Sequence, residues 1–342
     1  MGASAAAVQE MPAPAPARRA TPLLAIEELC VVMPRYRLEP QLVLRGIDLA
    51  MTPGEVLGLV GESGSGKTML ARSIMQLIPP PGRIERGRIR FDGQDLGALD
   101  DEALRRLRGR DIAMIIANPR GELDPLQTVG EQIGNILRYH LRMDRGAIRA
   151  RVLELLRRVS IPDPERRLKA YPHELSGGMA QRVIMAMALA CSPKFIISDD
   201  ATSGLDVTVQ AQVLELMRQL VVERDTSLLF ITRDIAITAH FCDRVAVIYA
   251  GEIMELAPRD EFFENPQHPY TLLLLAAFSQ NERLRRYWLG ENDAHKDMFP
   301  SPTGCAFANR CVRAQPRCRG EHPGLRELGP GHFVRCHFPV ER

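Results

Sequence analysis

The chain has no long apolar run. No window in its 342 residues approaches 18 uninterrupted apolar residues, so the chain is not expected to span a bilayer by itself. The first 22 residues, MGASAAAVQEMPAPAPARRATP, also lack the apolar core of a signal peptide. Their alternating Ala and Pro predict a disordered or extended arm over 1–22. We therefore expect a cytoplasmic protein that contacts a membrane only through a partner.

The chain also has little net charge. Its 44 Lys and Arg against 42 Asp and Glu leave +2, which gives no electrostatic reason to expect nucleic acid as the main partner. Apolar residues make up 45% and charged residues 25%, which is ordinary for a soluble globular protein. No internal repeat is visible.

Cysteine is scarce before residue 300. Cys30, Cys191 and Cys242 lie far apart in apolar or ordinary contexts and are predicted to be buried thiols. A cytosolic chain is not expected to hold disulfides, so a cysteine cluster near the C-terminus indicates a metal or iron–sulfur site. Its spacing, C-x5-C-x6-C-x17-C, differs from the paired C-x2-C of a zinc ribbon, and four thiolates suit either Zn²⁺ or a [4Fe–4S] cluster. Reduced cysteines without a metal are the alternative. The four cysteines are Cys305, Cys311, Cys318 and Cys336.

A phosphate-binding loop is the first strong motif. The apolar segment 56–60 predicts a buried strand, and GESGSGKT follows it at 61–68, matching G-x-x-x-x-G-K-[ST]. Its glycines let backbone N–H groups turn toward a phosphate at a helix N-terminus. Lys67 is expected to reach the β- and γ-phosphates, while Thr68 and Asp199, which ends an apolar strand, bind Mg²⁺. The expected phosphate-binding residues are Gly61, Glu62, Ser63, Gly64, Ser65, Gly66, Lys67 and Thr68.

Short apolar segments alternate with helical patterns along most of the chain. This alternation, opened by the phosphate loop, predicts a parallel sheet flanked by helices. A single strand is expected over 246–256, AVIYAGEIMEL. After Pro258 the pattern gives way to the segment PQHPYTLLLLAAF, a polar linker and the cysteine-rich tail, which places a domain boundary near 260.

The segment LSGGMAQR at 175–182 completes a second motif. It lies about 110 residues after the phosphate loop, and with that loop it resembles the signature sequence of an ATP-binding cassette (ABC) ATPase. The resemblance implies the α/β fold of a P-loop NTPase of the ABC cassette type, with a mixed sheet core and a helical subdomain, plus a small Cys-rich C-terminal extension. It implies the cassette over 23–260, the helical subdomain over about 118–180 and the extension over 261–342.

The same resemblance implies a dimeric nucleotide site. Ser176, Gly177, Gly178 and Gln181 would close over the γ-phosphate held by the opposite subunit, so that two cassettes enclose two ATP molecules. Asp206 belongs to the following loop, SGLD, which would cross the dimer interface. Tyr36 is the candidate for stacking on adenine. The implied cofactors are ATP and Mg²⁺.

Three positions depart from the family pattern. Asp200 stands where family members carry a glutamate that polarises the attacking water, Ala117 replaces a glutamine, and Arg233 replaces a histidine. Asp is one methylene shorter than Glu, and a misplacement of that size can cost about 10²-fold in rate. We expect a site that binds ATP but hydrolyses it poorly, although Asp200 acting as a weaker base is the alternative. The intact signature loop then implies a heterodimer with a different, catalytically intact ATP-binding subunit.

Two C-terminal segments narrow the resemblance. NPQHPYTLLLLAAF at 265–278 and GCAFANRCVRAQPRC at 304–318 resemble the ATP-binding subunits of dipeptide, oligopeptide and nickel importers. This branch implies a [4Fe–4S] cluster on the four cysteines rather than zinc, and a helix opened by His268, Pro269 and Tyr270. His337 would be a neighbouring donor or a surface residue. It further implies two membrane permease subunits, an external solute-binding protein, and a peripheral location on the cytoplasmic face of the inner membrane.

A second function remains open from the sequence. A soluble ABC ATPase module docked on a cytosolic enzyme complex of the carbon–phosphorus lyase type would share these motifs, and co-purification with membrane or soluble partners would distinguish the two. A DNA-repair or translation role is disfavoured because the chain has neither a coiled-coil insertion nor a second cassette.

Overall fold

The structure is a computed structural model that describes residues 21–35, 38–203, 207–224, 226–278, 300–301 and 303–340. Its strands are β1 (Leu24–Arg35), β2 (Leu38–Met51), β3 (Val56–Val60), β4 (Arg83–Phe91), β5 (Gln94–Asp95), β6 (Ile112–Ile116), β7 (Phe195–Asp199), β8 (Ser227–Thr232), β9 (Arg244–Tyr249), β10 (Glu252–Pro258), β11 (Arg326–Gly329) and β12 (His332–Val334). Its helices are α1 (Lys67–Ile74), α2 (Asp101–Leu107), α3 (Pro119–Glu122), α4 (Val129–Leu141), α5 (Arg145–Arg158), α6 (Pro164–Arg167), α7 (Gly177–Ala188), α8 (Val207–Arg224), α9 (Ile235–Phe241), α10 (Arg259–Glu264), α11 (Pro269–Phe278) and α13 (Pro316–Gly320).

An eight-stranded mixed sheet forms the centre of the molecule. Its strand order is β11-β12-β10-β9-β3-β8-β7-β6, and the pairs β9–β3, β3–β8, β8–β7 and β7–β6 are parallel. Every residue of β3, β7 and β8 is buried, as expected for parallel strands covered on both faces. Successive residues of β3 enter two different apolar clusters: Val56 and Val60 pack in one, Leu57 and Leu59 in the other. Because β9, β3, β8, β7 and β6 are parallel, their carboxyl ends meet along one edge of the sheet.

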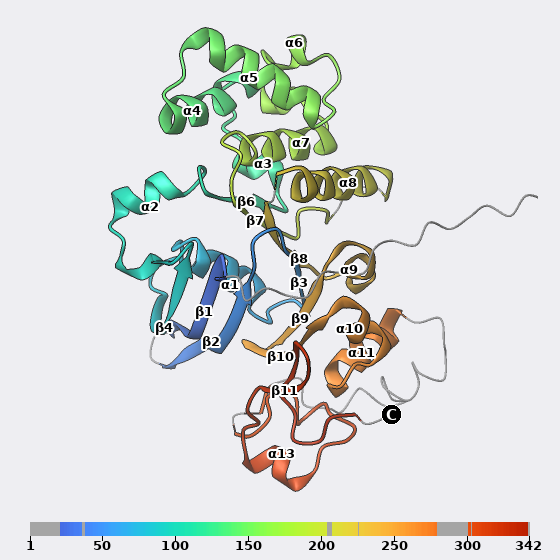
Figure 1. The fold of residues 1–342 in the computed structure, drawn as a ribbon. Coiled ribbons are helices and arrows are strands. Elements are labelled where there is room, and N and C mark those ends of the chain that lie inside the picture. The colour runs from blue at the N-terminus through green and yellow to red at the C-terminus, as the bar shows by residue number, and fades with distance from the viewer. Residues whose placement is uncertain are drawn as a thin grey trace, which may run out of the picture.

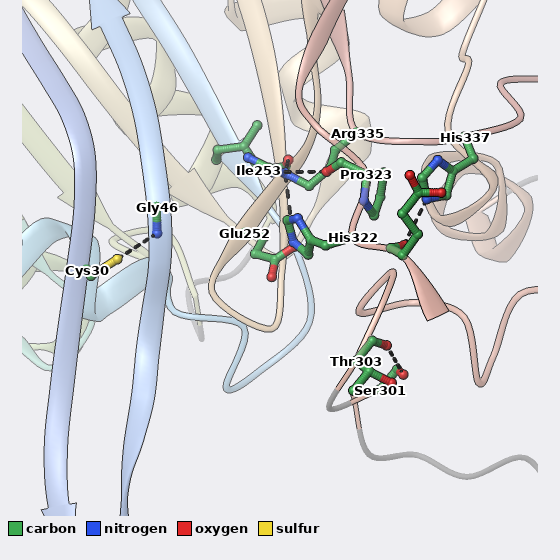
Figure 2. Close-up of polar contacts among 11 residues, drawn as sticks. Cys30, Gly46, Glu252, Ile253, Ser301, Thr303, His322, Pro323, Arg335 and His337 are labelled. Carbon is green, nitrogen blue, oxygen red and sulfur yellow. Dashed lines mark hydrogen bonds and ion pairs between the residues drawn. The ribbon is translucent and has the colours of Figure 1, made fainter. Parts of the chain in front are cut away.

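A second, four-stranded sheet covers part of the cassette and was not anticipated from the sequence. Its order is β2-β1-β4-β5, and all of its pairs are antiparallel. It lies beside α1 and below the helices α3–α7, which form a separate layer at the top of Figure 1. The backbone N–H of Gly46 on β2 donates to the Cys30 sulfur on β1 at 3.1 Å (Figure 2), so this predicted thiol is buried at a strand pair.

The predicted strand over 246–256 is wrong in one respect, because the structure has a hairpin there. Ala250 and Gly251 have φ values of 48° and 83°, and they turn the chain between β9 and β10, which pair antiparallel. A Cβ on Gly251 would lie 2.3 Å from the Val43 carbonyl oxygen, so the turn needs glycine. The sequence did not reveal this turn, because apolar residues lie on both sides of its two residues.

The C-terminal segment continues the central sheet. β12 pairs antiparallel with β10, and β11 pairs with β12. Side chains reinforce this junction, as Figure 2 shows: the His322 ring pairs with Glu252 at 3.0 Å, and Arg335 donates to the carbonyl oxygens of Ile253 at 3.0 Å and Pro323 at 3.3 Å. The domain boundary near 260 stays a prediction, but this sheet runs across it.

Among the residues that the structure describes, no helix is both long enough and apolar enough to cross a bilayer.

Candidate functional site

The phosphate loop lies between β3 and α1. The chain leaves the buried strand at Val60 and enters α1 at Lys67, with Gly66 at φ 112° immediately before the helix. A Cβ on Gly66 would lie 2.9 Å from Leu44 and 3.3 Å from the Val43 carbonyl oxygen. The strand–loop–helix order predicted from the motif is therefore present, and the free N–H groups of the first turn of α1 face the loop.

Lys67 points back into this loop. Its ammonium group donates to the carbonyl oxygens of Gly61 at 2.7 Å and Glu62 at 2.8 Å. The residue is only 8% exposed, and burial lowers its pKa, while the carboxylates of Asp200 and Asp199 oppose that shift. Two loop carbonyl oxygens thus hold the charged amine beside the loop. Phosphate oxygens could take the place of these carbonyl oxygens as hydrogen-bond acceptors.

A cavity of about 300 Å³ lies over the loop, which is within the usual range for small-molecule sites. It joins the phosphate loop to the carboxyl ends of β7 and β8. Its lining residues are Val43, Ser63, Gly64, Gly66, Lys67, Thr68, Met69, Asp199, Asp200 and Arg233. Residues more than 160 positions apart in the sequence therefore surround one space.

Thr68 and Asp199, the predicted Mg²⁺ ligands, lie together in this cavity. Asp199 is the last residue of β7 and is 8% exposed. Burial raises the pKa of its carboxyl group, and the hydrogen bond with the Thr68 side chain opposes the shift. A hydroxyl and a carboxylate oxygen are the ligand types that Mg²⁺ takes beside substrate phosphates, so the donor set fits this ion.

Two of the three substituted positions form an ion pair. Arg233 follows β8, and its Nε donates to Asp200 Oδ2 at 3.0 Å, while a second nitrogen donates to Ser203 Oγ at 2.9 Å. Asp200 adopts φ 53°, and its backbone N–H is held by the Ile231 carbonyl at 3.0 Å. The Asp200 carboxylate is therefore already bonded to Arg233.

Ala117 does not line the phosphate cavity. It follows the carboxyl end of β6 and is exposed. Gln181, which the signature motif marked as nucleotide-binding, is 1% exposed, and its side-chain amide donates to the Ile116 carbonyl oxygen at 3.5 Å. In this chain Gln181 thus links α7 to the end of β6.

The signature residues lie at the start of α7. Ser176 is the N-cap and accepts from the Met179 backbone N–H at 3.2 Å. Ser176 and Gly177 are exposed and Gly178 is half-buried, and among the described residues outside α7 and the adjoining chain no atom lies within 4 Å of a Cβ built on Gly177. These three residues do not line the phosphate cavity of their own chain. Tyr36 and Asp206, the other two predicted nucleotide-site residues, lie outside the described residues.

The four C-terminal cysteines line one enclosed cavity of about 20 Å³, together with His268, Phe307 and Phe338. Burial raises the pKa of Cys305 to about 12 and that of Cys336 to about 11, and the neighbouring thiols add to both shifts. Across the described ranges, however, no three His, Cys, Asp or Glu side chains are grouped closely enough to hold a metal ion. The donor chemistry therefore suits a metal or cluster, while the arrangement is not that of a preformed site.

The two histidines beside this cysteine cavity have different partners. His337 donates from Nε2 to the Glu321 carbonyl at 2.8 Å, which gives it a backbone partner. His268 is 1% exposed, and its Nδ1 accepts from the Tyr270 backbone N–H at 3.0 Å. The sequence singled out His268 only as a helix start.

Comparisons with known proteins agree with this geometry. A family model described as ABC transporter matches residues 44–203, and one described as oligopeptide/dipeptide transporter, C-terminal region, matches residues 254–318. The oligopeptide transport ATP-binding protein OppD of Bacillus subtilis (strain 168) is 42% identical over 93% of this chain and 89% of that protein. The dipeptide transport ATP-binding protein DppD of Escherichia coli (strain K12) is 40% identical over 86% of this chain and 90% of its own length.

Solved structures give the same fold for the cassette. The ATP-binding cassette MJ0796, solved as a dimer in a post-hydrolysis state with ADP and Pi, superposes with a TM-score of 0.63 and 26% identity, over 69% of this chain and 98% of that one. The protein cbiO1 of Clostridium perfringens superposes with a TM-score of 0.60 at 24% identity, over 77% of this chain and 97% of its own. The α/β cassette expected from the two motifs is confirmed.

Proposed function

The chain belongs to the ABC transporter family, in its oligopeptide and dipeptide branch, and from this premise we propose that it is the ATP-binding subunit of a peptide importer. The cavity over the phosphate loop carries the proposal, because it joins Lys67, Thr68 and Asp199 in one space. In this role the chain works with two membrane permease subunits and an external solute-binding protein, as a peripheral subunit on the cytoplasmic face of the membrane.

Binding of Mg²⁺–ATP follows from the side chains that line the cavity. The N–H groups at the start of α1 and the Lys67 ammonium would take the phosphates, with Lys67 exchanging its bonds to two carbonyl oxygens for bonds to phosphate oxygens. Thr68 and Asp199 would hold Mg²⁺, which neutralises phosphate charge when bound. Because the Asp199 carboxyl has a raised pKa, the ion also favours the ionised form that it needs.

We further propose that this chain hydrolyses its own ATP poorly. The Asp200 carboxylate is shorter than the family glutamate and is engaged by Arg233, which also holds Ser203. The bond to Arg233 occupies an oxygen of this carboxylate, which is then less available to orient an attacking water. Ala117 supplies no side-chain oxygen to hold a water. The three substitutions therefore act in the same direction.

The signature loop keeps the family pattern, whereas the chain's own site does not. This combination supports a heterodimer. Ser176, Gly177 and Gly178 are accessible at the start of α7 and are not used in this chain's own cavity. They are available to complete the site of a second ATP-binding subunit that carries its own phosphate loop. The transporter would then have one catalytic and one ATP-holding site.

We further propose that Cys305, Cys311, Cys318 and Cys336 hold a [4Fe–4S] cluster, for which their thiols must draw closer together than they lie in this structure. Four thiols that line one enclosed space provide the ligand set that such a cluster uses. When bound, the cluster would supply cross-links among the segments that carry these cysteines.

The function is tested by restoring the three family residues, Ala117→Gln, Asp200→Glu and Arg233→His. Wild-type and restored chains, each assembled with their partner subunits, would be compared for Mg²⁺–ATP binding and for single-turnover hydrolysis. We expect both to bind ATP and only the restored chain to gain hydrolysis, by about 10²-fold. Adding Lys67→Ala must remove the gain, which assigns it to this chain's site. Equal hydrolysis by both chains would contradict the impaired site, and failure of both to bind ATP would contradict the function.

A further inference from the structure

Glu62 of the phosphate loop has all of its polar groups engaged. Its carbonyl oxygen accepts from Lys67 at 2.8 Å. Its backbone N–H donates to the Tyr270 hydroxyl at 3.2 Å. Both of its carboxylate oxygens accept from Arg310, at 2.7 Å and 2.8 Å. Two of these three contacts come from residues more than 200 positions away, in the C-terminal segment.

Arg310 is held firmly where it meets Glu62. Its side chain is 15% exposed, and its guanidinium lies over the rings of Tyr249 at 5.6 Å and Phe307 at 5.7 Å. Such placement over aromatic faces adds a cation–π attraction to the ion pair. The hydrogen bonds to Glu62 raise the pKa of the guanidinium further. The bidentate geometry fixes direction as well as charge.

The two rings under Arg310 and the ring of Tyr270 connect this arginine to the rest of the molecule. Tyr249 ends β9, Tyr270 lies on α11, and Phe307 lies in the cysteine-bearing loop, with ring centroids 4.8–5.3 Å apart in each pair. The backbone N–H groups of Arg310 and Cys311 both donate to the Phe307 carbonyl at 3.0 Å. The position of Arg310 is therefore set by a tight turn in the loop that carries the cysteines.

Glu62 places a negative charge in a loop that must accept a polyphosphate. Left unpaired, the Glu62 carboxylate would add a negative charge to a loop that accepts phosphates, and the loop would lose an anchor. The Arg310 guanidinium, which itself lies over the Tyr249 ring, neutralises that carboxylate. The charged groups of the loop that face the phosphates are then the Lys67 ammonium and the partly positive backbone N–H groups.

We propose that Arg310 is a positioning residue for nucleotide binding: it acts through Glu62, so that the C-terminal segment holds the phosphate loop in its binding conformation. This inference rests on the proposed function, because it assumes that the loop binds Mg²⁺–ATP. It adds a contribution of the C-terminal segment to the nucleotide site itself. Arg310 does not contact the ligand.

The test measures the Kd for Mg²⁺–ATP of the full-length chain in its complex, for wild type, Arg310→Ala and Arg310→Lys. We expect Arg310→Ala to raise Kd about tenfold. Arg310→Lys should recover only part of the affinity, because an ammonium cannot make the bidentate contact. Arg319→Ala removes an exposed arginine of the same segment and serves as the matched control, with an unchanged Kd.

A double variant separates positioning from general damage to the fold. Removing the carboxylate as well, in Glu62→Ala/Arg310→Ala, should bring Kd back to within about twofold of Glu62→Ala alone, since the repelling charge is gone. Wild-type affinity in Arg310→Ala, or single effects that simply add in the double variant, would overturn the inference. Lys67→Ala, measured alongside, is expected to lose binding whatever happens at Arg310. If Lys67→Ala keeps the wild-type affinity, the proposed function fails. If Lys67→Ala loses binding but Arg310→Ala does not, only this inference fails.

Discussion

Gly61 illustrates how a single residue determines whether the phosphate loop can form. It begins the loop beside β9, and a Cβ built at this position would lie 2.3 Å from the carbonyl oxygen of Ile248. That oxygen belongs to a buried parallel strand and cannot move without shifting the sheet. Any side chain at residue 61 must therefore displace the loop.

We predict that Gly61→Ala weakens Mg²⁺–ATP binding by at least about tenfold, because the displaced loop changes the carbonyl that Lys67 contacts. Isothermal titration of the assembled complex would measure this change. Gly320→Ala is the matched control, since nothing lies within 4 Å of a Cβ there, and it should bind like wild type. Unchanged binding in Gly61→Ala would show that the loop adapts at little cost.

The residues of the site could be predicted one at a time from the sequence, but their pairing could not. The substitutions at Asp200 and Arg233 are readable because each stands in a recognisable motif. Their ion pair depends on β7 and β8 lying side by side, which brings the residues after the two strands together. The sequence signal for it was slight: Arg233 adds a positive charge in one motif, while Asp200 keeps a carboxylate in the other.

At the scale of whole elements, the central parallel strands were predictable because they are short, apolar and separated by clear helical patterns. The antiparallel sheet of β1, β2, β4 and β5 was not, because its partners are non-local: Ile26 pairs with both Leu49 and Ile89. Local pattern does not encode which strands pair. The β9–β10 turn was missed for a different reason, since it occupies only Ala250 and Gly251 within an apolar stretch.

The cysteine-bearing segment is the element for which a ligand can be tested directly. We predict that protein purified without oxygen contains about four iron and four sulfide per chain and is coloured. Cys305→Ser should lose iron and colour and should unfold at lower temperature, because it puts a hydroxyl in place of a thiol that is buried in the cysteine cavity.

Cys191→Ser provides the control, because Cys191 lies outside the four and is partly buried. It should keep its full iron content. Colourless wild-type protein without iron, prepared under the same conditions, would rule out the cluster and leave four reduced thiols packed around an apolar cavity.

At the scale of the whole molecule, the two halves of an ATPase site lie in different places on one chain. The phosphate cavity lies at the carboxyl ends of β3, β7 and β8, whereas the signature residues begin α7 and do not line that cavity. In the proposed assembly, one chain would offer its signature surface to another. The exposure of Gly177 and the open space around it fit such a contact.

We predict that Gly177→Asp abolishes ATP hydrolysis by the assembled transporter, by about 10²-fold or more, although it leaves this chain's own phosphate cavity intact. The new carboxylate would face the γ-phosphate bound by the partner subunit and repel it. Steady-state hydrolysis of the complex measures the loss, while Mg²⁺–ATP binding to this chain alone should not change. Normal hydrolysis in the Gly177→Asp complex would count against the shared site.

The pairing of β12 with β10 has a consequence for any shortened form of this protein. If the chain ended after Pro258, β10 would become the edge of the central sheet, with a row of unpaired N–H and C=O groups. The buried Glu252 and Glu255 would also lose His322 and His332. Such an edge pairs readily with a second copy of itself, so a cassette cut free of its tail is exposed to edge-to-edge aggregation from which the complete chain is protected.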